Sequence, residues 1–324
     1  MIYVKLAVTG GLGFIGSNFI EYAMKEHTSW QVLNIDKETY AANKAYLSQF
    51  ENSSRYEFIR GDISVKSEIE KSLQDVDIIV NFAAESHVDR SIDDSSAFVF
   101  SNYVGVKNLL EIATERGIRF HQVSTDEVFG SLSLNSIRKF NEETKYDPKN
   151  PYSATKAAAD HLTMAFHNTY GTKVTISYSG NNFGPHQHRE KLIPKTILSL
   201  YTGQKVPIYG NGLQKRDWVY VEDHCSAIDH ILMRARSGEK YVISSGTEKT
   251  NLEIVNKIAQ IMNIRGEVVE HVRDRLGHDV RYSSDPKLIM NKLGWKPKYD
   301  FDNALMLTVD HYINNIPIYT ENTN

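Results

Sequence analysis

The sequence contains very little cysteine: Cys225 is the only one among 324 residues. A single thiol excludes an internal disulfide, and it leaves no second thiolate for a cysteine-based metal site. Proteins without disulfides are typical of reducing compartments, so we expect a cytoplasmic protein.

The sequence also lacks an excess of either charge and lacks long hydrophobic runs. It has 37 basic and 40 acidic side chains, which leave a net charge of −3 and no overall field to recruit nucleic acid or an anionic membrane. No stretch reaches the roughly 18 consecutive apolar residues of a transmembrane helix. The N-terminal MIYVKLAVTGG has no basic region and no long apolar region of the secretory type. We therefore expect neither a nucleic acid nor a membrane as partner, and an anionic ligand would need a local cluster of basic residues.

What the first half does contain is an alternation of short apolar stretches with amphipathic ones. The expected strands are Val4–Thr9, Gln31–Asp36, Arg55–Arg60, Val76–Phe82, Phe120–Thr125 and Lys173–Ser177. The expected helices are Phe14–Lys25, Ser67–Leu73, Ala97–Arg116 and Pro151–Tyr170. Strands that alternate with helices predict a parallel sheet covered on both faces, joined by right-handed crossovers.

The alternation ends after about Ser179. The second half has glycine-containing loops and expected helices at Leu192–Tyr201, Glu222–Arg236, Leu252–Met262 and Asp302–Asn314. We expect a nucleotide-binding domain at 1–178 and a smaller α/β substrate-binding domain at 179–324, and leave open that some segments of the second return to the first.

A glycine-rich turn follows the first expected strand and opens the first helix. Gly10, Gly13 and Gly16 lie in TGGLGFIG, and Asp36 ends the second strand. Glycines allow the tight turn and the close approach of a pyrophosphate to a helix N-terminus, and the carboxylate would accept the ribose hydroxyls. The pattern predicts a doubly wound, Rossmann-type sheet that binds NAD, because Asp36 would repel the 2′-phosphate of NADP. Asp62 is a possible adenine contact, and equally a possible helix N-cap.

Tyr152 and Lys156 are spaced to share one face of a helix. Pro151 suits the first helical position and Asn150 the N-cap. A cation beside a phenol favours the phenolate, so we expect a lowered pKa that lets Tyr152 act as a base near neutral pH.

The fifth expected strand ends in Thr125, Asp126 and Glu127, at the edge of the sheet where ligands bind in such folds. Both acids can face one pocket only if the chain turns there, and Gly130 favours a turn. Neighbouring carboxyls in a closed site would have different pKa values, giving one protonated donor and one ionised base. The alternative is a solvated acidic turn, or a helix N-terminus that carries the two acids.

The sequence as a whole resembles the extended branch of the short-chain dehydrogenase/reductase superfamily, and within it the dTDP-glucose 4,6-dehydratase family. The glycine and Tyr/Lys motifs are common to the whole superfamily and do not distinguish its families. The resemblance to the narrower family depends on AAESHVDRSI, STDEVFG, PYSATKAAADHL, NNFGP, EKLIP, PIYGNG, RDWVYVEDH and RLGHDVRY, which extend across nearly the whole chain.

The resemblance implies a lyase that holds NAD through the reaction and removes water from dTDP-glucose, in the biosynthesis of dTDP-rhamnose or a related deoxysugar. It implies a catalytic set made of Thr125, Asp126, Glu127, Tyr152 and Lys156. Tyr152 would serve oxidation at C4 with help from Thr125, Glu127 would take the C5 proton, and Asp126 would protonate the leaving hydroxyl. The resemblance also implies a homodimer that pairs the helices near 97–116 and 151–170.

The binding residues follow from the motifs and the resemblance together. Those expected at the cofactor are Gly10, Gly13, Phe14, Ile15, Gly16, Asp36, Lys37, Thr39, Asp62, Ile63, Phe82, Ala83, Ala84, Ser101, Tyr152, Lys156 and Asn181. Those expected at the substrate are Ser86, His87, Thr125, Asn181, Asn182, Lys191, Leu192, Pro207, Tyr209, Arg216, Asn251, Arg275 and His278. Arginine suits a diphosphate because its planar guanidinium donates two parallel hydrogen bonds.

Two positions depart from the family pattern, and several alternatives stay open. Phe183 replaces a common tyrosine near the substrate loop, and Ala42 replaces a glycine near the adenosine pocket. No metal is expected, because His186 and His188 have no convincing third ligand. The alternatives are a UDP-glucose 4,6-dehydratase, a UDP-galactose 4-epimerase, which would not need the acid pair, and a non-catalytic NAD-sensing regulator, which we would expect to have lost Tyr152 or Lys156.

Overall fold

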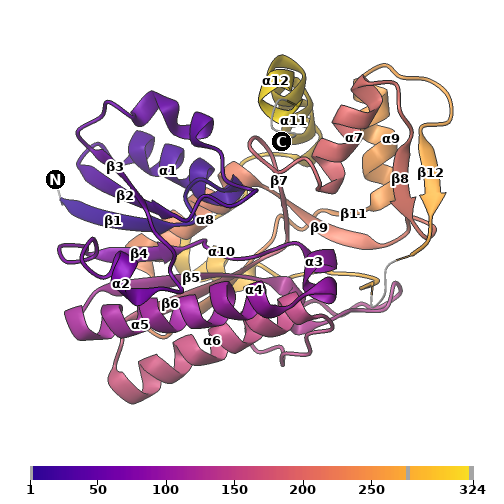
Figure 1. Ribbon diagram of the computed structural model, residues 1–324. Coiled ribbons are helices and arrows are strands. Elements are labelled where there is room, and N and C mark those ends of the chain that lie inside the picture. Colours follow the sequence, from indigo (N-terminus) through magenta and orange to yellow (C-terminus); the bar gives the residue numbers. More distant parts are fainter. Residues whose placement is uncertain (1–2, 275–277, 321–324) are drawn as a thin grey trace.

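A seven-stranded parallel sheet forms the centre of the protein (Figure 1). The computed structural model describes residues 3–274 and 278–320. The strand order is β10-β6-β5-β4-β1-β2-β3. The strands are β1 (Val4–Thr9), β2 (Trp30–Asp36), β3 (Tyr56–Arg60), β4 (Ile78–Asn81), β5 (Arg119–Thr125), β6 (Val174–Ser179) and β10 (Lys240–Ile243). The strand order reverses direction between β1 and β4, so the doubly wound α/β fold predicted from the sequence is confirmed.

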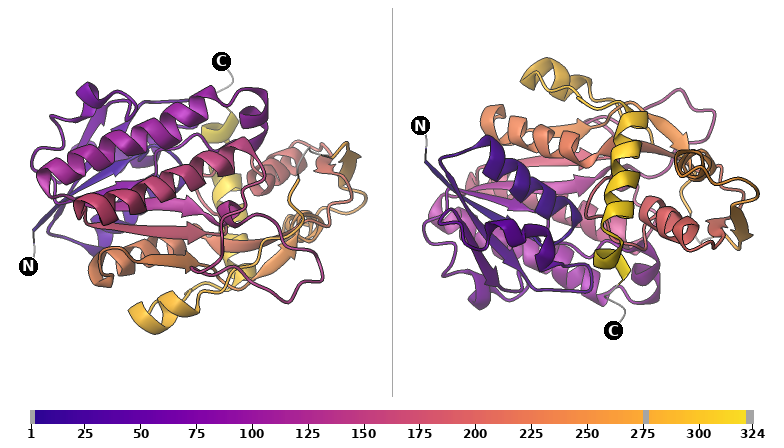
Figure 2. Two further views of the ribbon diagram at one scale, coloured as in Figure 1. Left: turned by 90° about the horizontal axis from the view of Figure 1, so that it is seen from below. Right: turned by 90° about the horizontal axis from the view of Figure 1, so that it is seen from above.

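Helices cover both faces of this sheet (Figure 2). On one face lie α2 (Lys66–Ile69), α5 (Gly105–Arg116) and α6 (Pro151–Tyr170); on the other lie α1 (Phe14–Glu26) and α8 (Val221–Arg234). Side chains alternate between the two faces along β1. Leu6 and Val8 pack in the core with Phe19 of α1, whereas Ala7 packs with Leu109 of α5. A strand buried on both faces has no polar side, which explains its continuous apolar run.

The long helix expected at 97–116 is interrupted. The chain forms α3 (Val88–Asp93), α4 (Ser96–Val99), a π turn at Phe100–Val104 and then α5. The side chain of Asn102 in this turn bonds to the backbone of Glu85 and to Thr155 Oγ1. A π turn inserts an extra residue into the helix, often near a functional site; this one contains Ser101, which accepts a hydrogen bond from Lys37.

The second half of the chain builds a smaller region and also returns to the large sheet. Its small sheets contain β7 (Asn181–Phe183), β9 (Lys215–Tyr220) and β11 (Glu248–Thr250), and separately β8 (Val206–Tyr209) and β12 (Val269–Val272). Its further helices are α7 (Leu192–Tyr201), α9 (Asn251–Ile261), α10 (Lys287–Leu293), α11 (Phe301–Asn314) and α12 (Ile316–Thr320). β10 pairs with β6, and α8 packs against α1. The expected division at 178/179 falls inside β6 and stays a prediction.

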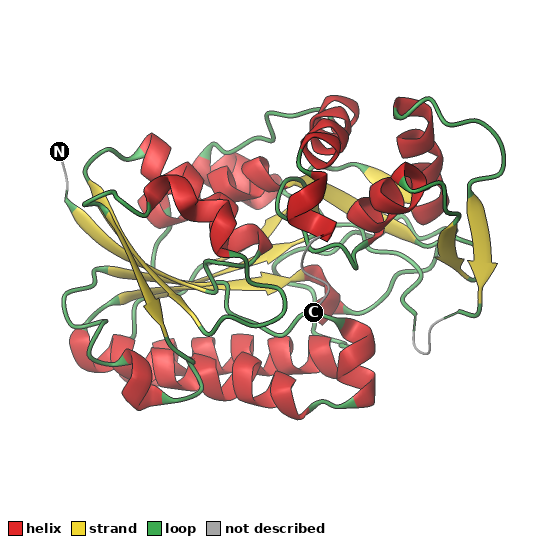
Figure 3. Cartoon of the chain, turned by 45° about the horizontal axis from the view of Figure 1, so that its top comes forward, coloured by secondary structure: helices red, strands yellow, loops and turns green. Residues whose placement is uncertain are grey.

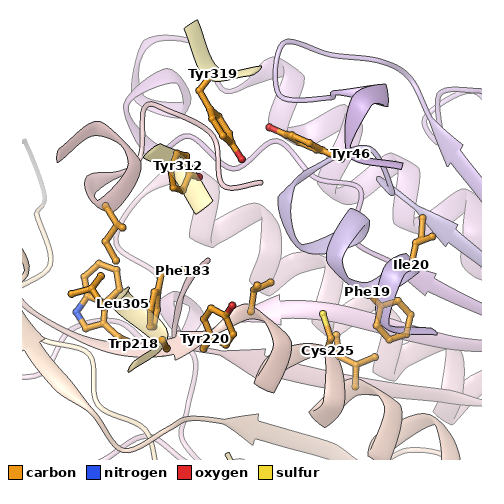
Figure 4. Close-up of a cluster of buried hydrophobic side chains, with 14 of the residues drawn as sticks. Phe19, Ile20, Tyr46, Phe183, Trp218, Tyr220, Cys225, Leu305, Tyr312 and Tyr319 are labelled. Carbon is orange, nitrogen blue, oxygen red and sulfur yellow. The ribbon is translucent and has the colours of Figure 1, made fainter. Parts of the chain in front are cut away.

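The two regions share a core, and the C-terminal helices lie across it (Figures 3 and 4). Tyr312 and Tyr319 pack together with ring centroids 4.3 Å apart, and Tyr319 reaches Tyr46 of the first half at 6.5 Å. Phe183, 1% exposed, lies in the same core beside Trp218. Within the described residues, no helix is long and apolar enough to cross a membrane.

Candidate functional site

The glycine turn between β1 and α1 presents a helix N-terminus to a cavity. Gly10 has a φ of +72°, and a Cβ on Gly16 would lie 2.3 Å from the Gly10 carbonyl oxygen, so larger residues would not fit. Gly13 is the N-cap of α1 and offers no side-chain hydrogen bond, and the first turn has no acidic residue. The first amide groups of α1 are therefore available to an anion such as a pyrophosphate.

Asp36 lies at the end of β2, next to this turn. One oxygen of its carboxylate accepts a hydrogen bond from the Leu12 amide at 3.0 Å, and the other accepts one from the Glu38 amide at 2.8 Å. Burial raises the pKa of Asp36, which these two hydrogen bonds oppose. Each oxygen keeps a second lone pair, so the carboxylate is fixed in place and can still accept ribose hydroxyls.

A single cavity gathers nearly all the residues expected at the cofactor. Of those residues only Asn181 is missing from its wall; it lines the neighbouring cavity instead. Residues that were not expected at the cofactor complete the wall, among them Tyr40, Glu85, Val123, Ser124, Gln187, His188 and Glu190. Gln187 to Glu190 come from a loop far along the chain, so only the tertiary fold shows that they reach this cavity.

Tyr152 and Lys156 lie on one face of α6, at the inner end of the cofactor cavity. Asn150 caps the helix in a reciprocal pair with Ser153, as the sequence predicted. Both functional side chains are buried. Lys156 Nζ donates to the backbone carbonyl of Val123 at 2.6 Å, and the Tyr152 hydroxyl is hydrogen-bonded to Thr125.

The expected lowering of the Tyr152 pKa is wrong for this arrangement. Burial raises the pKa of Tyr152, and the nearby acids Glu127 and Asp126 raise it further; the hydrogen bond from Thr125 opposes them. Burial also lowers the pKa of Lys156 to about 8. The sequence showed that the lysine lies near the phenol, but not that both groups are removed from water next to two acids. A base of this kind needs additional positive charge at the site.

The turn after β5 brings the acid pair to the same place. Thr125 caps a short 3-10 helix at Asp126–Phe129, where its side chain accepts a hydrogen bond from the Glu127 amide at 3.3 Å. Asp126 is buried, with Oδ2 lacking a hydrogen-bond partner, whereas Glu127 lines the second cavity. Burial raises the pKa of Asp126 well above its usual value, and the charges of Glu127 and Asp217 add to this effect. The surroundings of Asp126 thus favour its protonated form.

The second cavity adjoins the first and gathers most residues expected at the substrate. Its wall includes Ser86, His87, Asn181, Lys191, Leu192, Pro207, Tyr209, Arg216, Asn251 and His278. Ser86, Glu190 and Lys191 line both cavities, so the two lie side by side. Thr125 and Asn182 are not in its wall. The Asn182 side chain instead accepts a hydrogen bond from His224 at 2.9 Å and donates one to Ser179 Oγ. Arg275 lies outside the described residues.

Arg216 is held firmly in the wall of this second cavity. Its guanidinium donates to the backbone carbonyls of Lys215 and Asp279, both at 2.9 Å. Its positive charge also lowers the pKa of Asp126, although burial and the neighbouring acids prevail. Arg216 therefore lies within electrostatic reach of the acid pair as well as of any anion in the cavity.

The two departures from the family pattern lie in different surroundings. Ala42 lines the cofactor cavity, as expected for a residue near the adenosine pocket. Phe183 does not reach the substrate cavity: it packs between Trp218, Tyr220 and Phe301 in the core. The hydroxyl that Phe183 lacks therefore bears on packing in this core.

The histidines of the 184–190 loop have partners other than a metal. His186 stacks on Tyr46 with ring centroids 4.1 Å apart and shares a hydrogen bond with Ser17 Oγ at 3.0 Å. His188 lies 3.6 Å from the Glu190 carboxylate. Across the described part of the chain, no group of three or more histidine, cysteine and acidic side chains could hold a metal ion.

Comparison with known proteins places the chain among nucleotide-sugar dehydratases. The family model described as GDP-mannose 4,6 dehydratase matches residues 7–308. The dTDP-glucose 4,6-dehydratase of Haemophilus influenzae is 45% identical over 96% of this chain and 98% of its own, and that of Mycobacterium tuberculosis is 42% identical over 96% and 94%. The structure of the Streptomyces venezuelae dTDP-glucose 4,6-dehydratase DesIV, solved with NAD bound, covers 98% of this chain and 99% of its own, with 40% identity and a TM-score of 0.94. The chain belongs to the dTDP-glucose 4,6-dehydratase family.

Proposed function

We propose that this protein is an NAD-dependent hydro-lyase that converts dTDP-glucose into dTDP-4-dehydro-6-deoxyglucose and water. The observation that carries the proposal is the junction of the two cavities. Tyr152 lines the cofactor cavity, Glu127 lines the substrate cavity, and both acids act electrostatically on the Tyr152 phenol. An oxidation base and an acid pair for elimination thus serve the same small space, as a reaction with both steps requires.

The first step is oxidation of the sugar at C4, with Tyr152 taking the proton of the 4-hydroxyl. Thr125 bonds to the phenol and stabilises the phenolate as it forms. When bound, the oxidised nicotinamide supplies a hydride acceptor and additional positive charge beside the phenol. Lys156, fixed by its bond to the Val123 carbonyl, contributes a second cation to the same wall.

The second step is loss of water across C5 and C6. The ketone at C4 makes the C5 proton acidic, and Glu127 in the cavity wall removes it. Asp126 then protonates the departing 6-hydroxyl. Its raised pKa favours the protonated form, and its Oδ2 has no hydrogen-bond partner within the protein. Hydride return to C6 and protonation at C5 complete the reaction and restore the oxidised cofactor.

The diphosphate of the substrate would lie between basic groups of the second cavity. Lys191 and Arg216 bring positive charge to its wall, and His278 adds a hydrogen-bonding ring. Arg275, outside the described residues, remains a predicted phosphate contact. Because the chain has a small net charge, an anionic substrate needs a local cluster of basic residues, and these groups provide one.

The test is to incubate the purified protein separately with dTDP-, UDP-, GDP- and CDP-glucose and to identify the products. We expect the 4-keto-6-deoxy product with dTDP-glucose in clear preference to the others. A preference for UDP-glucose would make the protein a UDP-glucose dehydratase, and a 4-epimer without loss of water would make it an epimerase. No turnover with any sugar while NAD is bound would favour a sensor.

We also propose that the protein works as a homodimer in the cytoplasm, within deoxysugar biosynthesis such as that of dTDP-rhamnose. Large apolar side chains project into solvent near α4 and the π turn: Val99 is 42%, Phe100 59% and Tyr103 37% exposed. Such a group next to α6 suits a self-complementary helix interface. Light scattering on the purified protein would give its mass; a monomer at micromolar concentration would contradict the dimer.

A further inference from the structure

Two buried side chains of opposite charge, Lys156 and Asp160, lie on successive turns of α6, and both are hydrogen-bonded to the end of β5. Lys156 Nζ donates to the Val123 carbonyl at 2.6 Å, and one turn later Asp160 accepts a hydrogen bond from Ser124 Oγ at 2.5 Å. Val123 and Ser124 immediately precede Thr125, and both line the cofactor cavity. The helix that bears Tyr152 is therefore tied to the strand that delivers the acid pair.

Asp160 is enclosed by protein, so only neighbouring residues can supply its hydrogen bonds and opposite charge. Its side chain is fully buried, and Oδ1 has no hydrogen-bond partner. The groups that face it are Lys156 on its own helix, Ser124 on β5, Lys240 on β10 and the hydroxyl of Tyr146, which is in turn bonded to Tyr178 on β6. A carboxylate removed from water persists as an anion only beside positive charge and hydrogen-bond donors.

Burial shifts the pKa of Lys156 in the opposite direction to that of Asp160. An ammonium group buried among apolar atoms tends to lose its proton. Burial lowers the pKa of Lys156 to about 8, and the charge of Asp160 opposes this shift. The lysine ammonium in turn opposes the raised pKa of Asp160. Each group thus favours the charged form of the other, although burial still raises the pKa of Asp160 to about 7.

We propose that Asp160 is a positioning residue for the oxidation step: its buried carboxylate keeps Lys156 in the charged form and fixes α6 against the end of β5. The proposal rests on the dehydratase function proposed above. It assigns Asp160 no contact with substrate or cofactor, since its effect passes through Lys156 and Ser124.

The proposal predicts a specific change in pH dependence. Asp160→Asn keeps an oxygen that can accept the bond from Ser124 but removes the charge. Without the opposing anion, the pKa of Lys156 falls further, so the lysine loses its proton at lower pH. The alkaline limb of the kcat/KM profile should therefore move down by about one pH unit, the smaller end of the range for a neighbouring opposite charge. At pH 8 this is a loss of about fivefold relative to the wild type, and it approaches tenfold at higher pH.

The experiment compares the pH profiles of wild type, Asp160→Asn, Asp160→Glu and Tyr146→Phe with dTDP-glucose. Tyr146→Phe is the matched control, because it removes a hydroxyl from the same cluster but no charged group. That hydroxyl contributes least to lowering the Asp160 pKa, so the alkaline limb of this variant should lie close to that of the wild type. Asp160→Glu keeps the charge, so its limb should also remain in place even if the rate falls.

If folded Asp160→Asn shows the same alkaline limb of the kcat/KM profile as the wild type, the inference is overturned and Asp160 is a structural residue. If Asp160→Asn does not fold, Asp160→Glu decides: a downward shift despite the retained charge overturns the proposal, and an unmoved limb supports it. Absence of dehydration by the wild type would instead refute the proposed function, so the two failures are distinguishable.

Discussion

The guanidinium of Arg216 lies over the ring of Tyr282, with its carbon 4.4 Å from the ring centroid. Backbone carbonyls accept two hydrogen bonds from the same guanidinium, which is almost fully buried. Stacking and hydrogen bonds together give the group a fixed orientation at the wall of the substrate cavity. Arg216 therefore both supports the local fold and presents positive charge to an anion.

The first prediction concerns this double role. Arg216→Ala should weaken the binding of dTDP-glucose by roughly 1.5–3 kcal/mol, the range for a charged hydrogen bond, and the weaker binding should appear as a raised KM. The same change should lower the melting temperature. Arg281 provides the control: it is buried and paired with Glu248 at 2.6 Å, but it lines neither cavity. Arg281→Ala should destabilise the fold and leave KM unchanged. An unchanged KM in folded Arg216→Ala would place Arg216 outside the binding site.

The second prediction is that the purified protein retains NAD(H). The cofactor returns to its oxidised form in each cycle and need not leave, and Asp36 disfavours a 2′-phosphate. Denaturing the protein and analysing the supernatant by chromatography should give close to one equivalent of NAD(H). Asp36→Asn keeps the shape of the side chain but removes its charge, so it should narrow the preference for NAD over NADP. Recovery of stoichiometric NADP(H) from the wild type would contradict the role of Asp36.

The sequence predicted best those elements whose signals are local. β1, α6 and α7 begin and end at the residues expected, because apolar periodicity and, for α6, the Asn150 cap and Pro151 are properties of neighbouring residues. The catalytic turn was likewise indicated by Gly130, whose φ of +83° ends it.

Features that depend on distant partners could not be predicted in this way. The π turn at Phe100–Val104 is held by Asn102 against Glu85 and Thr155, a contact between three separate elements. The 184–190 loop reaches the cofactor cavity because α1 and the C-terminal helices hold it there. The raised pKa of Tyr152 depends on burial, which a helical spacing does not reveal.

The third prediction tests how that loop is held. The Tyr319 hydroxyl accepts a hydrogen bond from the His186 amide at 3.2 Å and shares another with His311 at 2.8 Å. Tyr319→Phe keeps the ring packing but removes both bonds, so the free energy of unfolding should fall by about 1–3 kcal/mol. NAD should also leave faster, because Gln187 and His188 line its cavity. Tyr170→Phe, at an exposed site on α6, is the control and should change neither urea unfolding nor NAD release.

The last prediction separates oxidation from elimination. Tyr152 is placed to take the proton of the 4-hydroxyl, so Tyr152→Phe should slow the appearance of reduced cofactor. Asp126→Asn and Glu127→Gln keep the shape of the side chains but remove their ionisable function, so oxidation should survive and the loss of water should fall by about 10²–10⁴. These two variants should accumulate reduced cofactor and a 4-ketoglucose nucleotide, which absorbance and mass spectrometry would detect.

The two acids can also be told apart from each other. Glu127 lines the cavity and is proposed to remove the C5 proton, so Glu127→Gln should suppress deuterium exchange from solvent at C5. Asp126 is buried, with a raised pKa and an unpartnered oxygen, and is proposed to act only on the leaving hydroxyl. Asp126→Asn should therefore still exchange at C5 while it fails to lose water. If both variants dehydrate at the wild-type rate, the pair is a structural turn, and an epimerase or simple dehydrogenase becomes the better account of the site.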